Sequence, residues 1–453
     1  MSGKKLLLLA LAALALLLGG AFLLWNEGTK ADLEAARQRL RDAHLPMTVD
    51  DIRPPPVPDA DNAALVLEKI APLLRALPQV DGKDFLMWFG DFQSKHKELH
   101  LDATATKELG DQLDSPPVQA VLALIREAAG KKEFNSNTDY SRGPQLFRYI
   151  SPLQQSAKLL GGHARLAASR GQSGEAAADV WAMTSLAEFP AKEPPALITL
   201  LTRVAIWGIT TAEMERLAVT GDLAPEWNQK FSARLAGINL SADLVRAFDV
   251  ERIVFGQQTF DQLLAGTYDL ANDVGKPDGW RDWKKWVRLQ AYRLPGVIRS
   301  ENADYLDYMR VFRAAVAAGA QNREALERRL GNVASYSPGG LILEVLVPTL
   351  EALSKNVLLR SHERLTVVQV GLAMERYRAA KGGYPAALSD LVPDFIKEVP
   401  PDVFTGKPLL YRTEPGGAVI YSVGKNLKDD GGIDDMDADK DDINWASGAD
   451  DEP

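Results

Sequence analysis

The stretch PQLFRYISPLQQSAKLLGGHARLAASRGQSGEAAADVWAMTSL, residues 144–186, decides the class of the fold. Apolar and small residues recur at helical spacing on both sides of Gly171, which predicts one helix over 144–170 and another over 173–186. Pro144 suits the first turn of a helix, where its missing N–H needs no partner. Because the connection is short, the two helices should be antiparallel neighbours.

The same helical texture extends from about residue 59 to residue 339, with further helix starts at Ser115 and Pro194. The hairpin around Gly171 resembles one tetratricopeptide-type unit, but no 34-residue period recurs elsewhere in the sequence. The sequence therefore predicts a mostly α fold: an irregular, antiparallel, tetratricopeptide-like stack of helices.

Composition excludes several classes of protein. Of 453 residues, 46% are hydrophobic and 25% are charged, which is typical of globular chains rather than disordered ones. The chain has no cysteine, so disulfides, thiolate metal sites and cysteine nucleophiles are excluded. Most of the net charge of −9 comes from the acidic segment 425–453. Since no basic surplus exists to neutralise phosphates, we expect no nucleic acid as a partner.

The amino terminus predicts a membrane segment. Residues 6–25 form an uncharged apolar run, long enough as a helix to cross about 30 Å of hydrocarbon. Lys4 and Lys5 precede it and Trp25 closes it, which favours a cytoplasmic start and an interfacial end. We therefore predict a single-pass signal anchor in a bacterial inner membrane, with the bulk in the periplasm. A cleaved signal peptide ending near Ala21 is the alternative.

The remaining boundaries follow from proline, glycine and charge. The predicted parts are residues 1–26 (anchor or signal peptide), 27–58 (charged stalk and the Pro-rich linker Arg53–Pro58), 59–339 (helical domain), 340–446 (long helix and α+β head with an acidic loop) and 447–453 (acidic tail). The long helix should end at Gly382, and strands over 409–413 and 418–422 should form a hairpin.

Three tryptophans stand out within the helical domain. Trp280, Trp283 and Trp286 are spaced by three residues and interleaved with lysines and arginines. We expect them to pack a helix onto its neighbours, which is the commoner use of aromatic residues at this spacing. A ridge that binds a membrane surface or a polymer is the alternative.

The carboxyl-terminal segment carries a family resemblance. Its motifs are Tyr377-Arg378 followed by Gly382-Gly383-Tyr384-Pro385, Asp402-Val403-Phe404-Thr405-Gly406-Lys407-Pro408-Leu409-Leu410-Tyr411, Tyr421-Ser422-Val423-Gly424, Asp429-Asp430-Gly431-Gly432 and Asp442-Ile443-Asn444-Trp445. In this order they resemble the head of the major pseudopilin of type II secretion, from about residue 358 to residue 446. The whole chain resembles uncharacterised exported bacterial proteins that join a helical region to such a head.

The resemblance implies a small pseudopilin-like α+β head, a calcium-binding carboxyl loop and no enzymatic activity. The chain departs from that family where the helical region separates anchor from head, where Thr405 is inserted, and where Asn426 replaces an aspartate. Assembly into a pseudopilus is therefore not implied.

Electrostatics independently favours a cation in the acidic loop. Eight aspartates lie between residues 429 and 442, and crowded carboxylates repel one another unless a cation compensates. Calcium accepts six to eight oxygens in irregular geometry. An EF-hand is excluded because Lys440 and Ala446 occupy its glycine and glutamate positions. The predicted metal ligands are Asn426, Asp430, Asp434, Asp439 and Asp442, with the Val423 carbonyl as a further candidate; the alternative is a solvated acidic tail.

Few other residues suggest chemistry. His96 and His100 are four residues apart and could share a helix face, but flanking lysines indicate a solvated surface. The sequence has no phosphate loop, nucleophile elbow or dinucleotide fingerprint. We expect a membrane-tethered binding or scaffold protein without catalytic residues, with envelope or secretion-system proteins as partners. An envelope hydrolase using carboxylates in a cleft is the alternative.

Overall fold

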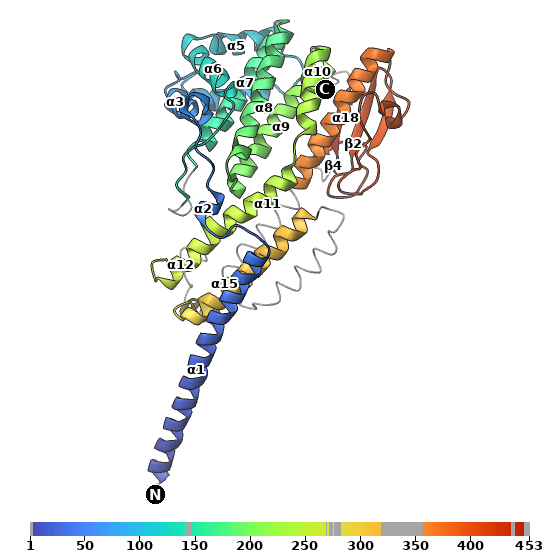
Figure 1. The fold of residues 1–453 in the computed structure, drawn as a ribbon. Coiled ribbons are helices and arrows are strands. Elements are labelled where there is room, and N and C mark those ends of the chain that lie inside the picture. The colour runs from blue at the N-terminus through green and yellow to red at the C-terminus, as the bar shows by residue number, and fades with distance from the viewer. Residues whose placement is uncertain are drawn as a thin grey trace. The chain divides into compact units, whose positions relative to one another are not determined.

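The computed structural model describes residues 3–140, 147–268, 270, 275, 282–318, 357–435 and 440–447. The described part is mostly helical and divides into two compact units, which are considered separately (Figure 1). The first unit comprises residues 1–53, 139–145 and 245–351, and the second comprises 54–138, 146–244 and 352–453.

In the first unit, a long amino-terminal helix packs against α15. Its elements are α1 (Gly3–Asp42), α2 (Val49–Ile52), the π-helix η3 (Glu251–Gln257), α12 (Gln258–Leu264), α14 (Trp283–Ala291) and α15 (Pro295–Ala317), and α11 (Leu240–Val250) leads into it. Leu33, Ala36 and Leu40 are spaced so that they share one face of α1, and all three are buried. The predicted stalk is therefore a helix packed along α15, continuous with the apolar run.

Within the part of the chain that the structure describes, two helices are long and apolar enough to span a membrane. One is the amino-terminal helix, whose apolar window is entirely unburied, and the other is α9 (Leu197–Val219), whose window is 61% buried. A mostly buried helix of this kind is the ordinary core helix of a folded domain. The predicted membrane segment thus coincides with the helix that the fold leaves uncovered.

The second unit joins a helical stack to a small sheet. Its helices are η1 (Asp59–Asp61), α3 (Ala63–Arg75), α4 (Phe85–Lys95), α5 (Ala103–Leu113), α6 (Pro116–Ala129), α7 (Ile150–Ser169), α8 (Ser173–Lys192), α9 (Leu197–Val219), α10 (Pro225–Ala236), α18 (Leu359–Lys381) and η7 (Leu388–Leu391). Its strands are β1 (Leu410–Glu414), β2 (Gly417–Ser422), β3 (Asp434–Asp435), β4 (Lys440–Asp441) and β5 (Ile443–Ser447).

The predicted helical hairpin forms, but it starts later than its first proline. α7 and α8 pack together across a turn at Gly171, whose φ of +74° suits glycine. The predicted start at Pro144 was wrong, because residues 147–149 are not helical and α7 begins at Ile150. Pro152 then lies in the first turn, where backbone N–H groups have no helical partner. Pro152, and not Pro144, is therefore the proline in the first turn of this helix.

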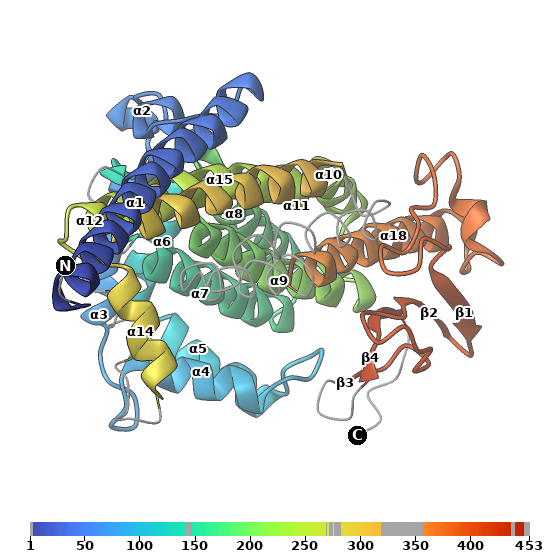
Figure 2. The same cartoon turned by 90° about the horizontal axis from the view of Figure 1, so that it is seen from below.

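The carboxyl-terminal chain folds onto α18. β1, β2 and β5 form an antiparallel sheet in the order β1-β2-β5, and the β1–β2 hairpin confirms the predicted strand pair. Ile443, Trp445 and Ser447 alternate inward along β5 and are buried. A Cβ at Gly371 would overlap the indole of Trp445, so that glycine admits the ring against the backbone of α18. Figure 2 shows the sheet and α18 side by side.

The tryptophan prediction was wrong for two of its three residues. Trp283 and Trp286 lie on α14 and are 50% and 55% exposed, so they do not pack into a core. Trp280 lies outside the described residues.

The contact between Gly371 and Trp445 predicts a loss of stability on substitution. Gly371→Ala should lower the free energy of unfolding by about 1–3 kcal/mol, because the added methyl displaces the indole. Gly208→Ala is the matched control: Gly208 also lies inside a helix, but nothing surrounds its Cβ position. That variant should match or exceed the parent. Thermal unfolding of both variants checks this, and equal effects would contradict the packing.

Candidate metal centre and surface groove

The acidic loop ends in a buried carboxylate. Asp442 directly precedes β5 and is fully buried. Its Oδ2 accepts backbone hydrogen bonds from Asp430 at 3.1 Å and Gly432 at 2.7 Å. Its Oδ1 is buried and has no hydrogen-bond partner among the described residues. Burial raises the pKa of Asp442, while the Gly432 N–H lowers this pKa and the charge of Asp430 raises it again.

Glycines in the left-handed conformation form the turns of the loop. Gly431 and Gly432 both have φ of +76°, a left-handed conformation that other residues rarely adopt. Gly424 is also left-handed, and a Cβ there would overlap the carbonyl group of Asp441. These turns bring the chain before β3 against the chain before β5.

Three of the five predicted ligands lie in one hydrogen-bonded network. The Asn426 Nδ2 donates to the Asp430 Oδ2 at 2.9 Å, and the Asp430 N–H reaches Asp442. The backbone of Asp434 pairs with Asp441 in the small β3–β4 sheet, and its side chain is not among those described. Asp439 lies outside the described residues. The structure thus brings Asn426, Asp430 and Asp442 together.

Other carboxylates of the loop already have protein partners. Asp441 pairs with Arg360 of α18 and accepts the N–H of Lys425 at 2.7 Å. Asp429 Oδ1 accepts a hydrogen bond from the Tyr421 hydroxyl at 3.0 Å and another from a backbone N–H. The electrostatic repulsion inferred from the sequence is therefore partly relieved by the protein itself.

The loop oxygens that remain available are of the kind that binds a hard cation such as calcium. Carboxylate and amide oxygens are the ligands that calcium prefers, and the buried Asp442 Oδ1 is an acceptor that lacks a donor. Among the described side chains, no group of three or more His, Asp or Glu residues is placed to hold a metal ion. A complete calcium site would need further oxygens beyond those of Asn426, Asp430 and Asp442.

A second buried carboxylate was not predicted. Glu363 of α18 is fully buried, and its Oε2 accepts the N–H of Val403 at 2.8 Å. Burial raises the pKa of Glu363 to about 8; the Val403 hydrogen bond lowers it, and the charge of Asp402 raises it. The signal was in the sequence, because helical spacing places Glu363 on the same face as Val367 and Val370, both buried.

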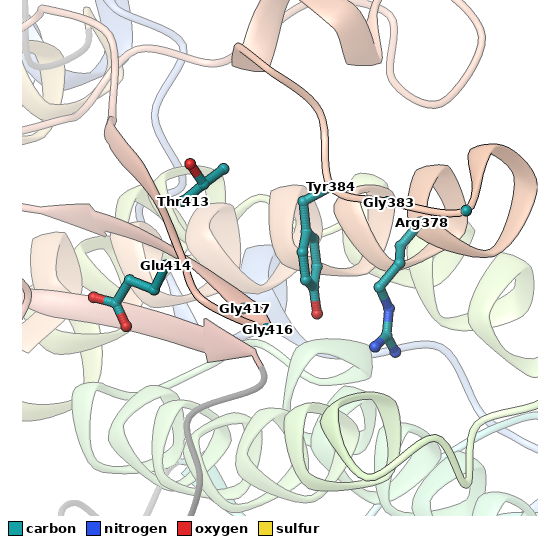
Figure 3. A pocket seen from close by; sticks show the side chains of 8 residues that line it. Arg378, Gly383, Tyr384, Thr413, Glu414, Gly416 and Gly417 are labelled. Atoms are coloured by element: carbon teal, nitrogen blue, oxygen red, sulfur yellow. The ribbon is translucent and has the colours of Figure 1, made fainter.

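An open groove lies between the end of α18 and the β1–β2 hairpin. Its volume is about 390 Å³, and its lining residues are Arg378, Gly382, Gly383, Tyr384, Thr413, Glu414, Gly416 and Gly417. Figure 3 shows Tyr384 and Arg378 extending from the α18 side, with Thr413 and Glu414 on the hairpin opposite.

The groove has a fixed cationic and aromatic wall. The Arg378 guanidinium lies 5.3 Å from the centre of the Tyr384 ring and forms a 2.7 Å ion pair with Glu375. Glu375 also accepts a hydrogen bond from Ser447 of β5, which links this wall to the sheet. The lining carboxylate of Glu414 pairs with Arg412 at 2.8 Å.

The histidine pair does not form a metal site. α4 ends at Lys95, so His96 and His100 do not share a helix face. His96 Nδ1 is 2.8 Å from a Glu98 carboxylate oxygen. His100 borders a cavity of about 10 Å³, which has room for about one water molecule.

A buried ionic cluster joins three helices of the stack. Asp179 of α8 forms a two-pronged contact with Arg126 of α6, at 2.7 and 2.9 Å, and is 2.6 Å from His163 Nδ1 of α7. Asp179 and His163 are buried, and burial with partners on two neighbouring helices indicates a structural role. No pattern in the sequence had pointed to this cluster.

Comparison of the chain with protein-family models, with curated proteins and with solved structures gave no match. The resemblance to a pseudopilin head therefore stays a prediction.

Glu363 predicts a specific pH dependence. Its pKa is higher in the folded chain than in the unfolded chain, so the folded state holds an extra proton between about pH 4.5 and pH 8. The stability that this proton contributes is present below that window and is lost as the pH rises through it, at about 1.4 kcal/mol per unit of pKa difference.

Glu363→Gln mimics the protonated acid and should remove this loss. The variant should match the parent near pH 4 and exceed its melting temperature at pH 8. Melting curves at several pH values check this, and a constant difference between the two proteins across the range would contradict it.

Proposed function

We propose that this protein is a membrane-tethered, extracytoplasmic binding or scaffold protein whose head is stabilised by calcium. The observation that carries the proposal is the buried Asp442 carboxylate, with one oxygen lacking a donor, beside Asp430 and Asn426.

Tethering is supported by the character of α1. Its apolar residues are exposed along the amino-terminal half: Leu16, Leu17 and Leu24 are 78%, 72% and 78% exposed. The helix continues through Gly19, Gly20 and Ala21, the predicted cleavage region, without a break. A continuous helix suits a retained anchor better than a peptide that must be extended for cleavage.

Calcium in the head would be held by Asn426, Asp430 and Asp442, with Asp434 and Asp439 as the further predicted ligands. The ion would supply positive charge to a loop in which two neighbouring carboxylates raise the pKa of Asp442. Its expected effect is structural, because the loop connects β2 to β5 and thereby holds Trp445 in place.

Binding is favoured over hydrolysis by the form of the groove. Catalysis by paired carboxylates requires two acidic groups that converge on one cavity. The groove has one lining glutamate, Glu414, which is engaged by Arg412, while Arg378 and Tyr384 form a wall suited to recognition. The head's resemblance to pseudopilins suggests envelope or type II secretion proteins as partners.

Calcium should raise the melting temperature of the full chain. At a concentration 100 times the dissociation constant, a single site adds about 2.7 kcal/mol to stability. Differential scanning fluorimetry with millimolar calcium, followed by chelator, measures the shift and its reversal. No rise with calcium would overturn the site.

Single substitutions in the loop show which residues the calcium response depends on. Asp442→Asn and Asp430→Asn should lose the calcium response, since each removes a proposed ligand charge. Asp429→Asn is the matched control from the same loop, because its carboxylate faces Tyr421, and it should keep the response. Equal responses in all three variants would contradict the assignment.

The chain's lack of cysteine makes its topology directly measurable. Glu68 is exposed on α3, and Glu68→Cys introduces a single thiol into the helical part. A membrane-impermeant maleimide should label it in bacterial spheroplasts with an intact inner membrane. Labelling only after lysis would place the bulk in the cytoplasm and refute the proposed location.

A further inference from the structure

The first unit carries an exposed apolar surface on a short helix. On α14, Trp283, Trp286 and Val287 are 50%, 55% and 46% exposed, and Leu294, just beyond the helix, is 40% exposed. At 100° per residue these three α14 side chains lie within about a third of the helix circumference. In the folded chain this face of α14 is exposed.

Cations flank and oppose this face. Helical spacing places Arg288 about 140° around the helix from Trp283. Lys284 flanks the face, and its ammonium lies 6.0 Å from the centre of the Trp283 ring. Tryptophan on one face with lysine and arginine on the other is typical of helices that lie in a membrane interface. Long cationic side chains there reach the lipid headgroups while their stems remain apolar.

Contacts with α1 fix where α15 begins along the anchor, directly after α14 in the sequence. Trp25, the last residue of the apolar run, packs on Gly296: a Cβ there would lie 2.6 Å from its ring. One residue further along, Asn26 Oδ1 accepts a hydrogen bond from Arg299 at 3.1 Å. The start of α15 is therefore held at the end of the apolar segment, and α14 ends only five residues before Gly296.

The direction of α14 agrees with this position. Figures 1 and 2 together show α14 running across the axis of α1 rather than along it. A helix that crosses a membrane-spanning helix at the end of its apolar run lies along the bilayer surface.

We propose that α14 is a membrane-surface helix that inserts Trp283, Trp286 and Val287 into the lipid headgroup region. The occupant of this face is the bilayer itself, and anionic lipid suits its cations. This inference rests on the proposed membrane anchor, and it adds a second attachment that holds the first unit against the membrane.

Single labels in the cysteine-free chain test the two ideas separately. Full-length protein is placed in phosphatidylethanolamine–phosphatidylglycerol vesicles, with an environment-sensitive fluorophore on Val287→Cys, Leu17→Cys or Glu34→Cys. Leu17 reports the anchor. Glu34 is the matched control, since it is exposed about 13 Å beyond Trp25 along the same helix.

The expected pattern is specific. The Val287 label should shift to the blue and lose intensity with lipids that carry a shallow nitroxide, and the Leu17 label should be quenched by a deep nitroxide. The Glu34 label should respond to neither. Replacing Trp283 and Trp286 with serine should relieve quenching at Val287 and leave Leu17 unchanged, which separates insertion from mere nearness to the bilayer.

The failures can also be told apart. An unquenched Leu17 label overturns the membrane anchor and this inference with it. A quenched Leu17 label beside an unquenched Val287 label overturns only the inference. A blue-shifted Val287 label that lipid nitroxides do not quench means that a protein covers this face, which also overturns it.

Discussion

The indole of Trp445 lies against the backbone of α18 at Gly371, and the head depends on this contact. It anchors β5, and β5 in turn completes the sheet by pairing with β2. Because β2 and β5 are both fixed, the acidic chain between them must close on itself. The aspartates are therefore brought close together because the strands at the two ends of the loop are packed in place. In a free tail, the same charges would spread into solvent.

The described carboxylates of the closed loop differ in whether protein groups satisfy them. Asp441 and Asp429 are matched by Arg360 and by the Tyr421 hydroxyl, so the fold supplies their compensation. From the residues that the structure describes, Asp442 receives two backbone N–H groups on one oxygen and no hydrogen bond on the other. A folded loop that satisfied every carboxylate would have no use for a cation. The incomplete oxygen at Asp442 is what favours calcium over a self-sufficient loop.

Features that depend on local sequence were predicted better than features that depend on contacts between distant segments. The α7–α8 hairpin, the β1–β2 hairpin and the turn at Gly431 follow from spacing and from glycine, which are local properties. The start of α7 at Ile150 was missed because two prolines compete, and only packing chooses between them. The burial of Glu363 could have been predicted from its helical spacing to Val367 and Val370. The pairing of Arg360 with Asp441, in contrast, arises where segments far apart in sequence meet, and no local pattern encodes that meeting. The exposure of Trp283 and Trp286 was missed for a similar reason, since aromatic spacing alone does not distinguish a buried helix face from an exposed one.

The two halves of α1 differ in what surrounds them. In water, each exposed leucine of its first half forgoes about 1.5–3 kcal/mol of burial free energy, which an apolar medium would supply. From Thr29 onward, residues on one face are buried within the first unit, and Arg39 reaches Asp307 of α15 through a 2.6 Å ion pair. The change occurs at Trp25 and Asn26, where α15 begins alongside. No free spacer separates the apolar segment from folded protein, so a bilayer around that segment would meet the start of α15 directly.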